Sequence, residues 1–187
     1  MSKVLTSIDY TRCATLLGVD PASVRAVVAV ECSGSGFLAD GRPKILFERH
    51  WFYKLTPLPV SKTRPDISNR QPGGYLGSTR EWDRLNAAIS FDRTAALKSA
   101  SWGLGQIMGF NYAFCGFDSV EALVGAMHES EGRQLEAMMR FIKANPSMHQ
   151  ALRDRNWQRF AYYYNGPAYR RNDYDNKLAA AFSRFQV

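Results

Sequence analysis

Glu31 constrains the fold of this chain most strongly, because it interrupts the apolar stripe of a predicted helix. The stretch VRAVVAVE begins at Val24 and ends at Glu31. At roughly 100° per residue, Glu31 falls about 20° from Val24, on the face that also carries Val27. A chain that packs this face against its core must therefore bury the carboxylate of Glu31. This position is not one where a solvent-exposed glutamate is expected.

The predicted helix around Glu31 has recognisable ends. Asp20 is a typical N-cap residue, Pro21 suits the first helical position, and the glycine-rich CSGSG follows Glu31. Burial and the negative partial charge of a helix C-terminus both raise the pKa of Glu31 above about 4.3. Two interpretations stay open here, a proton-donating catalytic group or a buried glutamate paired with an arginine. The arginines considered as partners are Arg25, Arg42 and Arg49.

Charge favours an anionic partner. The chain has 24 basic and 17 acidic residues, a formal net charge of +7, which suits nucleic acid, a lipid headgroup surface or bacterial cell wall. Basic residues near the C-terminus alternate with Tyr and Phe, but no nucleic-acid motif accompanies them. We expect a solvated helix face over an aromatic core there and no specific nucleic-acid partner. These residues are Arg153, Arg155, Arg159, Arg170, Arg171, Lys177 and Arg184.

Length and composition predict one soluble domain made in the cytoplasm. A chain of 187 residues with 45% hydrophobic content is large enough for a core with a cleft. No signal-peptide pattern is present, and no apolar run approaches the roughly 18 residues of a membrane span. Cys13, Cys32 and Cys115 are odd in number and far apart, so we expect three reduced thiols.

Secondary-structure patterns predict a mostly α protein with a small β or loop lobe near residues 36–77. The apolar run 44–47 follows a turn and is a possible strand, and 56–78 is rich in Pro, Gly, Ser and Asn, as in a long surface loop. Ser78 and Ser119 resemble helix starts. The helical runs predicted after this loop are 78–91, 92–108, 119–146, 149–166 and 174–185.

Two further stretches carry polar groups in apolar surroundings. Gln106 lies inside SWGLGQIM, where its amide must find partners or cost about 1–3 kcal/mol. The segment YYYNGP ends a helix with an aromatic cluster, Asn165 and a Gly-Pro stop. Taken singly, each is explained by a helix end with core aromatics.

Taken in order, these pieces resemble known enzymes. A helix-ending Glu followed by Ser, then Gly-Leu-x-Gln-Ile, then Tyr-Asn-Gly is similar to the order in goose-type lysozymes and lytic transglycosylases. The blocks ECSGSGFLADGRPKILFERHWF, SWGLGQIMGFNY and FAYYYNGPAYRRNDYDNKLA resemble the N-acetylmuramidase family of bacteriophage endolysins more closely. The resemblance extends from about Asp20 to Phe182. It implies a mostly α, lysozyme-like single domain over residues 1–187 that cleaves peptidoglycan, without a separate cell-wall-binding module.

The resemblance also implies a set of catalytic residues. Glu31 matches the catalytic glutamate, and Asp40 matches an acidic position that would be a second catalytic group. Thr56 is the candidate for a hydroxyl residue of the family's site, and Cys32 stands where Ser or Thr is expected. Read from the residues alone, Asp40 is equally well explained as the Asx-turn residue of Asp-Gly.

The substrate-binding residues are expected to line the cleft opposite Glu31. They are Gln106, Tyr164 and Asn165. Glu48 and His50 lack a third metal ligand, so we expect Glu48 to pair with a nearby arginine and no metal to bind. No nucleotide-binding glycine motif is present, so no cofactor is expected.

The activity implied is hydrolysis of the β-1,4 bond between N-acetylmuramic acid and N-acetylglucosamine by a monomer acting on bacterial peptidoglycan. Production in the host cytoplasm would require a holin-type partner to permeabilise the membrane before the enzyme reaches the wall. Two alternatives stay open: a lytic transglycosylase that forms anhydro-muramic ends, and a non-catalytic cell-wall or nucleic-acid binding domain on the same scaffold.

Overall fold

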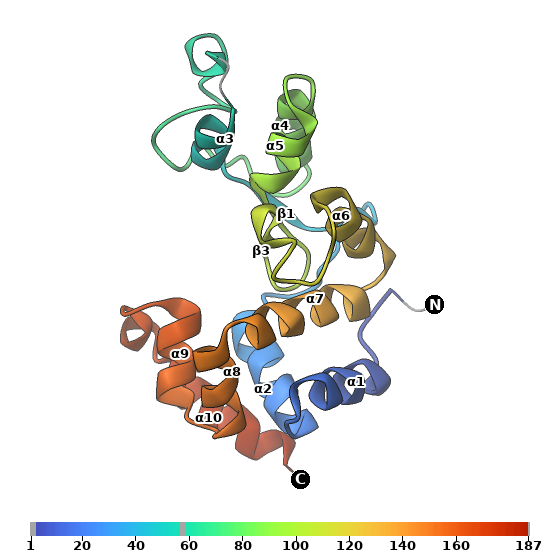
Figure 1. Cartoon of the computed structure of the whole chain (residues 1–187), viewed down its shortest axis with the longest axis vertical. Helices are drawn as coiled ribbons and strands as arrows, with labels where there is room; N and C mark the ends of the chain where they lie inside the picture. The colour runs from blue at the N-terminus through green and yellow to red at the C-terminus, as the bar shows by residue number, and fades with distance from the viewer. Residues whose placement is uncertain (1–2, 57–58, 187) are drawn as a thin grey trace.

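The computed structural model describes residues 3–56 and 59–186, and it is mostly helical with a small three-stranded sheet, as the sequence predicted (Figure 1). Two groups of elements lie on opposite sides of helix α7. The helical lobe contains α1 (Ser7–Leu17), α2 (Pro21–Glu31), α8 (Pro146–Arg153), α9 (Trp157–Asn165), the 3-10 helix η3 (Tyr169–Asn172) and α10 (Tyr174–Phe185).

The sheet lobe and the connecting helices make up the rest. The sheet lobe contains β1 (Ile45–Phe47), α3 (Arg49–Leu55), η1 (Val60–Lys62), α4 (Arg80–Ile89), α5 (Arg93–Lys98), β2 (Ala100–Trp102) and β3 (Ile107–Met108). The connecting segment contains η2 (Gly109–Asn111), α6 (Val120–Glu129) and α7 (Glu131–Ala144). In Figure 1, α7 runs between the sheet above it and α2 below it.

Helix α2 forms as its sequence predicts. The Asp20 carboxylate accepts a 2.7 Å hydrogen bond from the amide of Ala22, and proline occupies the first turn. Val24 and Val27 are fully buried, so the apolar stripe does face the core. The helix ends at Glu31, which places this carboxylate at the helix C-terminus.

The prediction of a helix over residues 92–108 is wrong for most of that run. Only Arg93–Lys98 is helical, and the rest forms the antiparallel hairpin of β2 and β3, with β2 pairing to β1 through Ile45 and Trp102. All three residues of β2 are buried. A short, fully buried strand has no alternation, so its hydrophobic pattern cannot be distinguished from that of a buried helix. Gly103, at φ 66°, permits the turn between the two strands.

Polar caps divide two of the predicted helical runs. Ser130 accepts from the amide of Arg133 and starts α7, and Asn156 accepts from the amide of Arg159 and starts α9. The predicted start at Ser119 is confirmed, because its hydroxyl accepts from the amide of Ala122. Helix α1 was not predicted.

The predicted helix start at Ser78 is wrong. Helix α4 begins at Arg80, and Ser78 has a left-handed φ of 50°. Glu81, expected to complete a capping box, instead accepts hydrogen bonds from the amides of Leu76 and Gly77. The expected loop 56–78 is irregular apart from η1, and its residues 57–58 lie outside the described part of the chain.

A continuous hydrophobic core joins the two lobes. Trp102, Phe47 and Phe52 form its sheet-lobe end, and Leu135 and Met138 of α7 carry it to the helical lobe. Within the described residues, no single helix is long and apolar enough to cross a membrane, and α1 with α2 meets that test only as a pair bent by 108°.

Candidate active site

Glu31 lies where the C-terminal ends of α2 and α9 meet. The side-chain amide of Asn165, the last residue of α9, donates a 2.9 Å hydrogen bond to Glu31 Oε1. Cys32 Sγ lies 3.9 Å from Met138 Sδ, so α7 packs against the residue that follows Glu31. Three helices from distant parts of the sequence thus fix the position of this carboxylate.

The electrostatic surroundings of Glu31 favour its protonated form. Burial raises the pKa of Glu31, and the hydrogen bond from Asn165 opposes this only in part. Within residues 3–56 and 59–186, no cation forms an ion pair with Glu31. The raised pKa is therefore not offset by a neighbouring positive charge.

The interpretation of Glu31 as a buried salt-bridge residue is wrong, because each candidate arginine is engaged elsewhere. Arg25 packs over the ring of Tyr10, 5.0 Å from its centroid. Arg42 forms an ion pair with Asp40, and Arg49 donates to backbone carbonyls of the 65–72 segment. Glu31 is thus a half-buried carboxylate whose partner is neutral.

Glu81 provides a contrast within the same chain. It is 0% exposed, forms a 2.8 Å ion pair with Arg84, and accepts a hydrogen bond from the amide of Phe47. Burial acts to raise the pKa of Glu81, but backbone hydrogen bonds and the charge of Arg84 outweigh it and lower the pKa. The surroundings of Glu81 therefore favour its ionised form, whereas those of Glu31 favour its protonated form.

The groups next to Glu31 stay neutral. Burial, followed by the charge of Glu31, raises the pKa of the Cys32 thiol to about 12. Burial also raises the pKa of Tyr164, whose ring stacks on Phe160 with centroids 5.6 Å apart. The surroundings of Glu31 are therefore largely apolar and uncharged.

Asp40 lies in an exposed turn of the segment that follows α2. It accepts from the backbone amide of Arg42 at 3.1 Å and from the Arg42 guanidinium at 2.8 and 2.6 Å. These hydrogen bonds lower the pKa of Asp40. Asp40 thus has the Asx-turn geometry that its Asp-Gly sequence favours, and it is ionised at neutral pH.

Thr56 belongs to the sheet lobe, at the end of α3. Its side chain is 8% exposed, and its hydroxyl donates to the carbonyl of Phe52, one turn earlier. This contact ties the hydroxyl to its own helix.

Gln106 uses its amide inside the β2–β3 hairpin. Its Nε2 donates to the carbonyl of Gly103 at 2.8 Å and to that of Lys44 at 3.3 Å, and its Oε1 accepts from Ser101. Lys44 in turn donates to the carbonyl of Ser33, close behind Glu31. Gln106 therefore braces the turn that faces the segment after Glu31.

Two polar residues of α7 were missed by the sequence interpretation. The Glu131 carboxylate accepts from the Ser35 hydroxyl at 2.7 Å and from the Gly36 amide at 2.8 Å. Buried Gln134 accepts from the amide of Leu104 at 2.8 Å and donates to the carbonyl of Gly36. Their spacing of three residues, which places both on the apolar face of α7, is the sequence feature that could have predicted their burial.

Contrary to expectation, Glu48 forms no ion pair with an arginine among residues 3–56 and 59–186. The hydroxyl of Tyr75 donates to both of its carboxylate oxygens at 3.0 and 2.9 Å, and His50 Nδ1 lies 3.2 Å away. These contacts hold the loop before α4 against α3. Among the described residues, no group of three His, Cys, Asp or Glu side chains is arranged to hold a metal ion.

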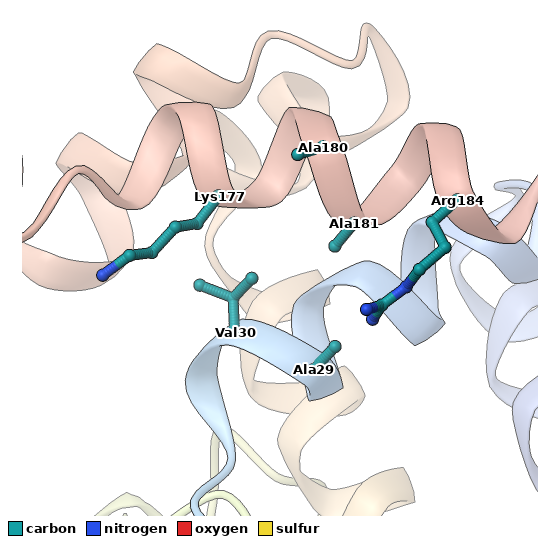
Figure 2. A pocket seen from close by; sticks show the side chains of 6 residues that line it. All are labelled: Ala29, Val30, Lys177, Ala180, Ala181 and Arg184. Atoms are coloured by element: carbon teal, nitrogen blue, oxygen red, sulfur yellow. The ribbon is translucent and has the colours of Figure 1, made fainter.

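A pocket of about 450 Å³ lies between α2 and α10, next to the end of α2. Figure 2 shows Lys177 and Arg184 of α10 at its two ends, with Ala29 and Val30 of α2 between them. Glu31 is not among its lining residues. The pocket is thus a groove beside the candidate site that is lined by alanines and by the basic side chains of Lys177 and Arg184.

Comparisons with known proteins found one family and one similar crystal structure. The model of the N-acetylmuramidase family matches residues 20–186. The crystal structure of the Burkholderia AP3 phage endolysin superposes with a TM-score of 0.96 and 44% sequence identity, covering 100% of this chain and 73% of that one. Among curated proteins no match was found.

Proposed function

Because the chain belongs to the N-acetylmuramidase family, we propose that Glu31 is the general acid of its reaction. The chain is a peptidoglycan-degrading muramidase, a glycoside hydrolase similar to a phage endolysin. The bond that we assign to it is the β-1,4 linkage between N-acetylmuramic acid and N-acetylglucosamine. The observation that supports this role is the half-buried Glu31 with a raised pKa and a neutral partner.

The environment of Glu31 suits proton transfer to a leaving oxygen. A protonated Glu31 donates to the glycosidic oxygen as the bond to the anomeric carbon breaks, and positive charge develops on the sugar ring. The carboxylate formed keeps its hydrogen bond from Asn165, which stabilises the ionised form. Water then adds to the anomeric carbon and loses its proton to a carboxylate.

We propose Asp40 as the second catalytic group, with Glu48 and Thr56 next in order. The lowered pKa of Asp40 supports this, because the second group of a glycosidase acts as an anion. The bond from Thr56 to its own helix favours a supporting role for that hydroxyl. Tyr164 and Asn165 are proposed to contact the sugar on the α9 side. Gln106 was expected to bind the sugar as well, but its amide bonds to the carbonyls of Gly103 and Lys44, so we propose that it holds the opposing turn.

Product analysis tests the reaction type. Mass spectrometry of digested peptidoglycan should show reducing muramic ends, because water is the acceptor in hydrolysis. A lytic transglycosylase would give anhydro ends lighter by one water, since the sugar's own hydroxyl closes the ring. A digest containing only anhydro ends would contradict the hydrolase assignment, and an unchanged substrate would contradict both.

A second experiment tests the order of the candidate groups. Asp40→Asn removes the charge and keeps the shape of the turn, so turnover should fall if Asp40 orients water or stabilises the developing cation. Asn69→Asp, on the loop of the sheet lobe, is a control for altered surface charge. If Asp40→Asn and Asp40→Ala both retain full turnover, the same measurement on Glu48→Gln and Thr56→Val identifies the second group.

We propose that residues 1–187 act as one catalytic domain, which the continuous core supports. We also propose that the protein acts as a monomer. We also propose that the protein is made in the host cytoplasm and reaches the wall after a holin-type partner permeabilises the membrane. This follows from its similarity to an endolysin. Lysis on co-expression with a holin, and none without one, is the result expected.

A further inference from the structure

A small pocket on the helical lobe is lined by arginine and tyrosine side chains. Its volume is about 230 Å³, and it lies between α9 and η3. Two arginines, three tyrosines and one glutamine line it: Gln158, Arg159, Tyr162, Tyr163, Tyr169 and Arg170. The pocket therefore combines planar cations with aromatic walls.

Each of the two arginines hydrogen-bonds to a tyrosine, while Asp154 and Asp175 act on them through charge alone. Arg170 Nε donates to the hydroxyl of Tyr169 at 3.1 Å, and Arg159 hydrogen-bonds to Tyr163. Neither arginine forms an ion pair with a carboxylate in the described part of the chain. Each guanidinium has five N–H donors, so most remain available to an external anion.

The walls of the pocket are themselves held in place. Tyr169 is 6% exposed, and the rings of Tyr162 and Tyr163 meet edge to face with centroids 5.5 Å apart. Tyr163 is also hydrogen-bonded to Ser147, near the start of α8. The buried ring of Tyr169 is thus positioned before any ligand binds, which lowers the entropic cost of binding, whereas Tyr162 and both arginines remain exposed to solvent.

The pocket adjoins the site of Glu31 through α9. Tyr162 precedes Asn165 by three residues, so the two lie on the same side of the helix. Arg159 precedes Asn165 by six residues, a distance of about 9 Å along the axis. The pocket and Asn165 therefore lie less than two turns apart on one helix, with Arg159 turned about 120° from Asn165 around its axis.

We propose that this pocket binds a free carboxylate of the peptide stems that branch from the glycan chain of peptidoglycan. The proposal rests on the proposed function, since it places the scissile bond at Glu31. A guanidinium binds a carboxylate through two parallel N–H bonds, and two arginines line this one small pocket. Tyrosine rings can pack against the aliphatic atoms of the peptide. Glycan without stems offers no such anion.

The test compares two forms of one substrate: peptidoglycan strands with stems, and the same strands after an amidase has removed them. Arg159→Gln with Arg170→Gln should raise KM on stem-bearing strands about tenfold or more, with kcat changed less than about twofold. On stem-free strands both constants should match those of the unmodified enzyme. The charge-matched control is Arg93→Gln with Arg153→Gln, two exposed arginines outside the pocket, which should leave both constants unchanged on both substrates.

Binding to the inactive Glu31→Gln protein separates this proposal from the proposed function. Its affinity for stem-bearing strands should exceed that for stem-free strands, and the double arginine substitution should abolish the difference, whether or not cleavage occurs. An equal loss on both substrates would overturn the proposal in favour of glycan binding. Lost binding to phosphatidylglycerol vesicles with unchanged KM on stem-bearing strands would overturn it in favour of a phosphate-binding surface.

Discussion

At the scale of single residues, charge is set by the neighbours that the fold supplies. Glu81 and Glu31 are both removed from much of the solvent, yet the pKa is lowered in one and raised in the other. Arg84 and backbone amides stabilise the ionised form of Glu81. Glu31 instead has one neutral hydrogen-bond partner, the side-chain amide of Asn165. A raised pKa keeps a carboxylic acid protonated at a pH where an exposed glutamate is ionised.

Glu31→Gln should lower turnover on purified peptidoglycan by about 10²- to 10⁴-fold, because the amide keeps the shape but has no proton to deliver. The control is Glu129→Gln, which neutralises an exposed glutamate whose side chain is 59% accessible. A Glu31→Gln enzyme within about threefold of the unmodified rate would remove Glu31 from the proposed mechanism.

The same substitution should change how stability depends on pH. Because the folded protein raises the pKa of Glu31, the contribution of its protonated form is fully present below the ordinary glutamate pKa and is lost as pH rises through the folded pKa. Glu31→Gln cannot ionise, so its free energy of unfolding should not show this loss. Urea unfolding at about pH 4 and pH 7 measures both proteins, and a larger loss in Glu31→Gln would contradict the assignment.

Asn165→Ala should move the basic limb of the pH–rate profile to higher pH. The hydrogen bond from Asn165 lowers the pKa of Glu31, so its removal lets burial raise that pKa further. A general acid works while protonated, and the active range therefore extends upward even as kcat falls. Asn145→Ala, at the start of α8, serves as an amide control. A basic limb that moves down in pH would contradict this.

At the scale of elements, α7 organises the loops on which the site depends. Glu131 and Gln134 bind the segment just after Glu31 and the turn of the β2–β3 hairpin, while Met138 contacts Cys32. Gly36 and Gly103 lie so close to Gln134 that any side chain at either position would collide with it. One helix therefore holds the two opposing loops at a fixed separation.

Gln134→Leu should lower the free energy of unfolding by about 1–3 kcal/mol, because the amide of Leu104 and the carbonyls of Gly36 and Met127 lose a buried partner. Gln150→Leu is the matched control, since Gln150 is exposed and bonds only to the side chain of Asp154. Chemical denaturation measures both. Equal stability losses in the two variants would show that Gln134 does not brace the loops.

At the scale of the whole molecule, we expect the net charge of +7 to act on the approach to the substrate and to have little effect on the chemical step. Cell walls carry anionic groups, and long-range attraction between exposed charges is screened by salt. The basic groove between α2 and α10 and the arginine pocket on α9 both contribute to this positive surface. Attraction to the wall and cleavage of the glycan should thus respond differently to ionic strength.

Salt should weaken binding to intact cell walls gradually, whereas cleavage of a short neutral muro-oligosaccharide should change little between about 0.05 and 0.5 M salt. DNA binding should be weak at about 0.15 M salt, where the Debye length is about 8 Å and scattered charges act almost independently. Sedimentation with walls, oligosaccharide turnover and DNA titration measure the three quantities. Submicromolar DNA affinity alongside inert peptidoglycan would contradict the muramidase assignment.

The sequence by itself determined the parts of the protein that depend on local periodicity and caps. Helix α2, its start at Asp20 and the burial of its stripe follow from the 3.6-residue period and from N-cap chemistry. The motif order also identified the family that the comparisons confirm. It placed Glu31 at the end of an apolar helix, where a carboxylate has an unusual proton affinity.

Tertiary structure alone decided which group meets Glu31. Its partner Asn165 is 134 residues away in the sequence, and the nearer arginines turn to other partners. Likewise, the buried strand β2 lacks the alternation of apolar and polar residues that would identify it as a strand. The side-chain amide of Gln106 bonds within the β2–β3 hairpin, which the sequence did not indicate. Such choices depend on which surfaces pack together across the whole chain, because side-chain pairing between distant segments has no local period to read.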